Sequence, residues 1–161
     1  MLKSIPILAT LAVLATLPTP AVAGATVNIK LWDNGETLDL SKNMGMVPGT
    51  TMDMSKAPMG IKAQPVLVPQ GKVLFKVTND SKAVIHEMLL APISSPTAAL
   101  AYIDKENRAD EKSANGLGEV SELDPGKSGE LSVNMKPGSY ILYCNVPGHL
   151  GAGMWTTITV K

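Results

Sequence analysis

The fold is decided by the stretch Tyr140-Ile-Leu-Tyr-Cys144-Asn-Val-Pro-Gly-His149-Leu-Gly-Ala-Gly-Met154-Trp-Thr-Thr-Ile-Thr-Val160. Each end carries an alternating apolar run, which is typical of a β-strand, so we expect strands over residues 139–144 and 154–160. Between them lies a loop rich in Gly and Pro, along which Cys144, His149 and Met154 recur at intervals of five residues. Such a loop can curl so that the three side chains meet at one point, with Pro147-Gly148 making the bend.

Further strands are expected wherever apolar residues alternate between turn signals. These runs are 26–32, 64–68, 71–78, 84–90, 119–123 and 128–135. About seven or eight short strands, with turns roughly every eight to twelve residues, indicate an all-β sandwich or barrel in a single domain. Residues 92–118 are the least determined part, and the polar run 104–112 reads as a solvated surface segment.

The chain contains only two histidines, and the second one, His86, lies far upstream in the run 84–90. A period of two places His86 on the same strand face as the apolar Met88 and Leu90. The adjacent Glu87 points to the opposite face. We therefore expect His86 to point inward, beside the loop that carries Cys144.

A thiolate, two imidazoles and a thioether form the ligand set of a mononuclear blue copper site. Cys144 is the only cysteine, so it has no partner for an internal disulfide and a dinuclear copper site lacks its second thiolate. Two histidines are too few for a multicopper oxidase, and the paired spacings of a structural zinc site are absent. A Cys–His nucleophile would make the chain an enzyme, but the order of residues and the methionine fit copper better.

The motif Tyr143-Cys144-x-Val146-Pro147-Gly148-His149-x4-Met154, with His86 upstream, resembles the cupredoxins: plastocyanin, pseudoazurin, azurin and their relatives. The resemblance covers residues 64–161. It implies a Greek-key β-sandwich and one type 1 copper ion held by His86, Cys144, His149 and Met154. It also implies one-electron transfer between redox partners rather than enzymatic catalysis.

By the same resemblance, His149 is expected to lie nearest the surface and to conduct electrons through its ring edge. The neighbouring residues are then expected to form a small apolar patch that contacts redox partners; they are Val146, Pro147, Gly148, Leu150, Gly151 and Ala152. The sequence departs from the family at one position, because many small cupredoxins have Asn after the first His ligand and this chain has Glu87. We expect Glu87 to accept hydrogen bonds from the Cys-bearing loop rather than to bind the metal.

The segment 43–60 is an irregular, Met-rich excursion in which Gly and Pro interrupt any period. Its two Met-x-Met pairs are Met44/Met46 and Met52/Met54. Thioethers select Cu(I), so these four residues are candidate secondary Cu(I) ligands, and copper binding, buffering or resistance is an alternative function. Methionines also serve as adaptable packing residues at apolar edges. The sequence leaves both readings open.

Residues 1–23 have the positive start, apolar run and Ala-x-Ala ending of a signal peptide, with cleavage expected after Ala23. We therefore expect export to the periplasm and a mature domain over 24–161, without stable membrane insertion. Removing Lys3 leaves 13 basic and 14 acidic residues and a net charge of −1. This charge does not favour nucleic-acid binding, which needs a clustered basic surface. We expect a monomer that meets redox proteins as partners.

Overall fold

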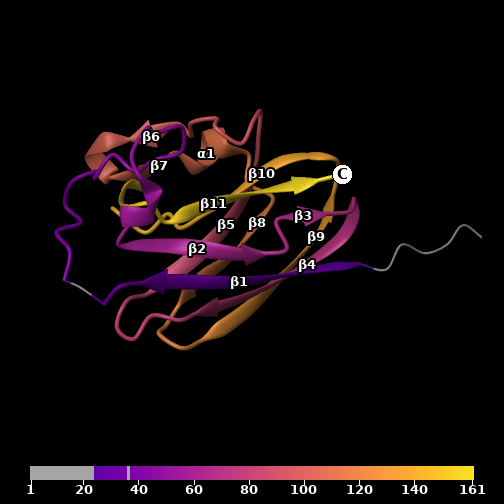
Figure 1. Cartoon of the computed structure of the whole chain (residues 1–161), viewed down its shortest axis with the longest axis horizontal. Helices are drawn as coiled ribbons and strands as arrows, with labels where there is room; N and C mark the ends of the chain where they lie inside the picture. Colours follow the sequence, from indigo (N-terminus) through magenta and orange to yellow (C-terminus); the bar gives the residue numbers. More distant parts are fainter. Residues whose placement is uncertain (1–23, 36) are drawn as a thin grey trace, which may run out of the picture.

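Two β-sheets pack face to face in the computed structural model, which describes residues 24–35 and 37–161 (Figure 1). The predicted signal peptide, 1–23, lies outside the described residues. The first sheet has the order β2 (Met59–Gln64), β1 (Ala25–Asp33), β4 (Gly71–Asn79) and β9 (Ser128–Met135). The second has the order β3 (Leu67–Val68), β11 (Trp155–Val160), β10 (Gly138–Tyr143), β5 (His86–Ile93) and β8 (Gly118–Leu123).

The chain crosses from one sheet to the other on both sides of the short β3, between β4 and β5, between β8 and β9, and between β9 and β10. Strands β1 and β4 are parallel, as are β3 and β11, whereas the other pairs within the two sheets are antiparallel. These crossovers give the expected all-β Greek-key sandwich. Within the part of the chain that the structure describes, no helix has the length and apolarity needed to span a membrane.

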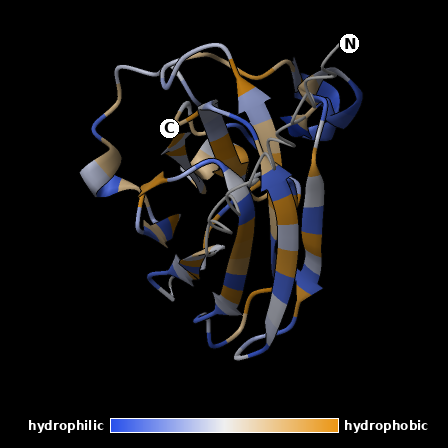
Figure 2. Ribbon diagram, turned by 90° about the vertical axis from the view of Figure 1, so that its right-hand side faces the viewer, coloured by the Kyte–Doolittle hydropathy of each residue, from blue (hydrophilic) through white to orange (hydrophobic). Residues whose placement is uncertain are grey.

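Apolar and polar residues alternate along the strands, as the banded ribbons of Figure 2 show, and the buried positions form the core between the sheets. In β1, Val27, Ile29 and Leu31 are buried, while the residues between them face solvent. Burying such a side chain stabilises the fold by about 1.5–3 kcal/mol. The same alternation continues to Asp33 at the end of β1, and this carboxylate therefore points toward the end of the core.

A second apolar cluster covers the outer face of the second sheet. It joins Leu89, Ala91 and Ile141 to Ala109 and Ala114. The latter two come from the segment between β5 and β8, which contains β6 (Tyr102–Ile103), η2 (Asp104–Glu106), β7 (Arg108–Ala109) and α1 (Glu111–Ala114). The reading of 104–112 as a wholly solvated segment is therefore wrong, because Ala109 and Asn107 are buried.

Two expected strands differ from the structure by more than one residue at an end. The expected strand 64–68 is broken at Pro65, and β2 begins earlier, at Met59, inside the Met-rich segment. The expected strand 84–90 begins at His86 and continues through Pro92 to Ile93. Proline is tolerated there because β8 pairs with β5 only as far as Leu90, so one side of β5 needs no donor beyond that residue.

Candidate metal centre

Strand ends bring the predicted ligands together at one end of the sandwich. β5 begins at His86, Cys144 directly follows β10, and Met154 directly precedes β11, and these strands are neighbours in the second sheet. The Nδ1 atom of His149 lies 3.2 Å from Nδ1 of His86 and 3.3 Å from Sγ of Cys144. The ligand atoms of these three residues all lie within 4.8 Å of one another, as for a single ion.

Met154 closes the loop on which two of these groups lie. Its backbone N–H donates to the carbonyl oxygen of His149, and its own carbonyl oxygen accepts from the N–H of Cys144, each at 3.0 Å. The side chains of His86, Cys144 and Met154 are fully buried, and His149 is 3% exposed. The centre is therefore dry and has its ligand loop held in shape by its own backbone.

Burial sets the protonation of the three groups. It lowers the pKa of His149 to about 4, helped by the nearby charge of His86. It also lowers the pKa of His86, although the hydrogen bond and charge of Asp33 oppose the shift. Burial raises the pKa of the Cys144 thiol to about 12, against hydrogen bonds from the N–H groups of Glu87 and Val146. Near pH 7 the two imidazoles are therefore neutral and able to bind a metal through a lone pair. The Cys144 thiol is protonated, so a metal that binds there must displace its proton.

Asp33 is a residue of the centre that the sequence analysis did not identify. Its Oδ2 lies 3.1 Å from Nε2 of His86, and its side chain is only 7% exposed. Burial raises the pKa of Asp33, but hydrogen bonds with Ser81, His86 and the N–H of Gly35 outweigh it, so the net pKa is lowered and the group stays a carboxylate. The signal was present, because the period of β1 places Asp33 on the inward face with Leu31.

Glu87 behaves as expected and ties the Cys-bearing loop to β5. Its Oε1 accepts a 3.0 Å hydrogen bond from the N–H of Asn145, the residue after Cys144. Burial, together with the nearby carboxylates Glu119 and Glu111, raises the pKa of Glu87. The side chain of Asn145 continues the connection by accepting from the N–H of Ala109 in β7. The loop is therefore anchored on two sides.

His149 does not lie at an exposed apolar patch. Of the six residues expected to form that patch, Gly148, Leu150, Gly151 and Ala152 are buried, and only Pro147 is exposed. The prediction of an exposed apolar patch is therefore wrong. His149 is nevertheless the least buried of the four expected ligands, as predicted, and its role as an electron port stays a prediction. The residues that shield the loop come from segments 40–57 and 102–109, which lie around η3 (Leu150–Ala152) in Figure 1.

The segment 40–57, which we call the covering segment, packs closely on the ligand loop. The N–H of Met46 donates to the carbonyl oxygen of Gly151, and the indole N–H of Trp155 donates to the carbonyl oxygen of Met46. A Cβ added at Gly153 would lie 2.8 Å from Cβ of Ala57 and 3.1 Å from Cε of Met54. The covering segment therefore lies against Gly153, where it leaves no room for a side chain.

The methionines of the Met-rich segment fall into two groups. Met46 and Met59 are buried and serve as packing residues. Met44 and Met52 are exposed, at 39% and 49%, and Met54 is partly exposed. Core packing therefore explains the buried methionines of this segment but not the exposed ones.

Comparison with known proteins identifies the fold. No protein-family model and no curated protein matches the sequence. Rusticyanin from Thiobacillus ferrooxidans superimposes with a TM-score of 0.53 at 18% identity, covering 86% of this chain and 79% of rusticyanin. Auracyanin B superimposes with a TM-score of 0.54 at 20% identity, covering 89% of this chain and 93% of auracyanin B. Both are cupredoxins. This chain has the cupredoxin fold.

A third cupredoxin of known structure, reduced auracyanin from Roseiflexus castenholzii, is matched over 99% of its length with a TM-score of 0.50 at 18% identity. At such identities the likeness demonstrates the shared cupredoxin fold. The assignment of ligands within it depends on the geometry of His86, Cys144 and His149. These three side chains fit a metal that prefers sulfur and imidazole ligands, because they converge as neutral or soft donors in a buried centre.

Proposed function

We propose that this protein is a type 1 copper protein that carries single electrons between redox partners. The observation that supports it most is the convergence of His86 Nδ1, His149 Nδ1 and Cys144 Sγ in one buried group. Met154, which follows the same loop and is fully buried, is proposed as the weak axial ligand. When bound, copper would supply a one-electron couple between Cu(I) and Cu(II).

The residues of this chain would hold the ligands still while the charge of the centre changes. The hydrogen bonds from Met154 to His149, and from Cys144 to Met154, fix the loop from within. The contacts of Asn145 with Glu87 and Ala109 fix it from outside. Burial excludes water from the sulfur. A centre preorganised in this way changes shape little on gaining or losing an electron.

The test is the visible spectrum of the Cu(II)-loaded protein. We expect an intense thiolate-to-copper band, because Cys144 is the only thiol in the chain. Cys144→Ser is expected to remove the band entirely, since an alcohol cannot supply that charge transfer. Exchanging one buried group for another of similar size is expected to preserve the fold, which far-UV circular dichroism checks. A parent protein whose Cu(II) form is colourless would contradict the proposal.

A second function, copper handling, is favoured by the exposure of Met44 and Met52 on the covering segment. Such exposed thioethers are available to Cu(I), whereas a role in core packing would bury them. The segment also contacts the ligand loop at Gly151 and Gly153, so ions bound there would be close to the main centre. We propose this role beside electron transfer, since the two use different residues.

Cu(I) stoichiometry distinguishes the two roles. If the segment binds Cu(I), the protein should take up more than one equivalent in competition with a Cu(I) chelator. The double variant Met44→Leu, Met52→Leu should return this to one, because leucine keeps the volume and lacks the sulfur. Met59→Leu, in the buried start of β2, is the matched control and should leave the count unchanged. A count of one in the parent protein would exclude this role for the segment.

We further propose that the protein is exported and works in the periplasm. The positive start, apolar run and Ala-x-Ala ending of residues 1–23 support this proposal. Its redox partners would then be exported or membrane-bound proteins that face the same compartment.

A further inference from the structure

We infer that Asp33 is the positioning residue of the copper centre: its carboxylate fixes the His86 ring and its tautomer, and its negative charge favours Cu(II) over Cu(I). The inference goes beyond the ligand set and rests on the proposed function. It depends on the contact between Asp33, the last residue of β1 in the first sheet, and His86, the first residue of β5 in the second sheet.

The contact determines which nitrogen of His86 is free. An ionised carboxylate only accepts hydrogen bonds, so the Nε2 atom, 3.1 Å from Asp33 Oδ2, must carry the ring proton. Nδ1 is then left with its lone pair. That atom is the one that faces His149 Nδ1, at 3.2 Å. Asp33 therefore prepares His86 as a ligand before any metal arrives.

Asp33 is itself held in place. Its other oxygen, Oδ1, accepts a 2.8 Å hydrogen bond from the N–H of Gly35, which fixes the carboxylate from the chain that follows it. Ser81, also buried, lies near the carboxylate in the loop between β4 and β5 and helps to lower the pKa of Asp33. A carboxylate fixed at both oxygens holds the histidine ring at a defined angle. Partners of this kind commonly change metal affinity by about 10–100-fold when removed.

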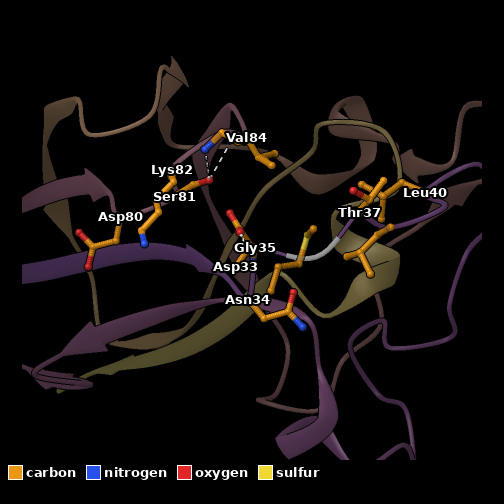
Figure 3. Close-up of a pocket in the computed structure, with 12 residues that line it drawn as sticks. Asp33, Asn34, Gly35, Thr37, Leu40, Asp80, Ser81, Lys82 and Val84 are labelled. Carbon is orange, nitrogen blue, oxygen red and sulfur yellow. Dashed lines mark hydrogen bonds between the residues drawn. The ribbon is translucent and has the colours of Figure 1, made fainter.

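The surroundings explain how a charge persists at the end of the core. Asp33 lines a pocket of about 590 Å³. Figure 3 shows its walls, which include residues 33–35, Thr37 and Leu40 and the loop 80–84. On this side the carboxylate borders the pocket, whereas on the other it contacts the fully buried His86. The negative charge therefore acts on the centre through a direct 3.1 Å contact with a buried ring, where it is screened less than between exposed charges.

The chain offers a matched pair of substitutions. Asp33→Asn keeps an oxygen that can accept from His86 but removes the charge, whereas Asp33→Ala removes both. Asp80→Asn removes a charge from the wall of the same pocket without touching His86, since Asp80 pairs with Lys30 at the surface. We expect Asp33→Asn to shift the Cu(I)/Cu(II) equilibrium about tenfold toward Cu(I), a rise of about 59 mV in reduction potential. Asp80→Asn is expected to shift it much less.

The first measurement needs no copper. Nitrogen-15 chemical shifts of the metal-free protein report the tautomer of each histidine. The chain has only two histidines, so only two sets of ring signals need assigning. We expect His86 to carry its proton on Nε2 in the parent and in Asp33→Asn, and to lose this preference in Asp33→Ala. The Ala variant is also expected to bind Cu(II) about 10–100-fold more weakly in competition with a chelator.

A parent protein with the His86 proton on Nδ1 would overturn the inference, whatever the variants do. So would equal potentials for Asp33→Asn and Asp80→Asn in a protein that shows the thiolate band. A parent protein without that band would instead overturn the proposed function, while the tautomer measurement would still decide the role of Asp33 toward His86.

Discussion

Acidifying the metal-free protein from pH 6.5 to pH 4 is expected to remove up to about 3 kcal/mol of its folding free energy. The cause is His149, whose pKa burial lowers to about 4 from an ordinary value of 6.5. In this pH range the unfolded chain binds a proton at His149 and the folded chain does not. Acid therefore favours the unfolded state. The folded state keeps the full stability that goes with a neutral His149 only above pH 6.5, and it loses this stability as the pH falls toward 4.

Two other groups of the metal centre lower the stability in acid as His149 does. The pKa of His86 is also lowered by burial, and that of Asp33 is lowered by its hydrogen bonds, so both bind protons more readily once the chain unfolds. Each of these contributions is lost as the pH falls. The fall in stability should therefore continue below pH 4 as Asp33 becomes protonated.

Urea unfolding of the metal-free protein at several pH values between 4 and 7 measures this effect. Two controls isolate its source. His149→Asn, which cannot take up the proton, should flatten much of the slope above pH 4. The Cu(II)-loaded protein should resist acid further, because a metal-bound imidazole is closed to protons. A metal-free protein equally stable at pH 6.5 and pH 4 would show that His149 titrates normally.

Gly148→Ala is expected to destabilise the protein by about 2–5 kcal/mol and to disturb the copper spectrum. Gly148 has a φ of +87°, which costs any residue with a Cβ about 1–2 kcal/mol. An added Cβ would also lie 2.5 Å from the carbonyl oxygen of Leu40 and 2.7 Å from its Cβ. Leu40 belongs to the covering segment, so backbone must move to make room.

The clash would disrupt the contacts that organise the loop. Asn107 accepts a 2.7 Å hydrogen bond from the N–H of Gly148 and donates another, also 2.7 Å, to the carbonyl oxygen of Leu40. Separating Leu40 from Gly148 breaks this bridge one residue before His149. The thiolate band of the copper-loaded variant should therefore shift or weaken.

Gly126→Ala is the matched control for the backbone term. Gly126 has a similar φ of +73°, but nothing lies within 4 Å of its added Cβ. It should cost only about 1–2 kcal/mol and leave the spectrum unchanged. Urea unfolding of both metal-free variants gives the comparison. If both variants lost the same free energy of unfolding, the covering segment would be able to move away from the Cβ added by Gly148→Ala without destabilising the protein, and the prediction would be wrong.

The features that could be predicted are those that depend on the sequence pattern of a single strand or loop. Alternation correctly placed His86 inward and Glu87 outward, and β9 has the predicted bounds 128–135. The fixed spacing of Cys144 and His149 in one loop likewise indicated that they meet. Each of these features depends on residues within about ten positions of one another, so the local pattern was sufficient.

The features that escaped prediction join distant segments. Asp33 meets His86 across 53 positions of sequence, and Asn107 meets Leu40 across 67. Asp33 precedes Asn34-Gly35 and so has the appearance of an ordinary turn residue. Asn107 lies in a polar run whose composition is that of a solvated surface. Only the packing of the covering segment and the β6–β7 hairpin on the ligand loop gives these residues their roles.

Because of the covering segment, the affinity of the centre for an ion and the rate at which it exchanges that ion depend on different residues. Affinity depends on the sulfur and imidazole donors, which are in place before binding. Since Cys144 and His149 are buried beneath the segment, passage through this face requires a local opening of the structure. Residues far from the donors, such as Leu40, Met46 and Asn107, would then set the lifetime of the loaded protein.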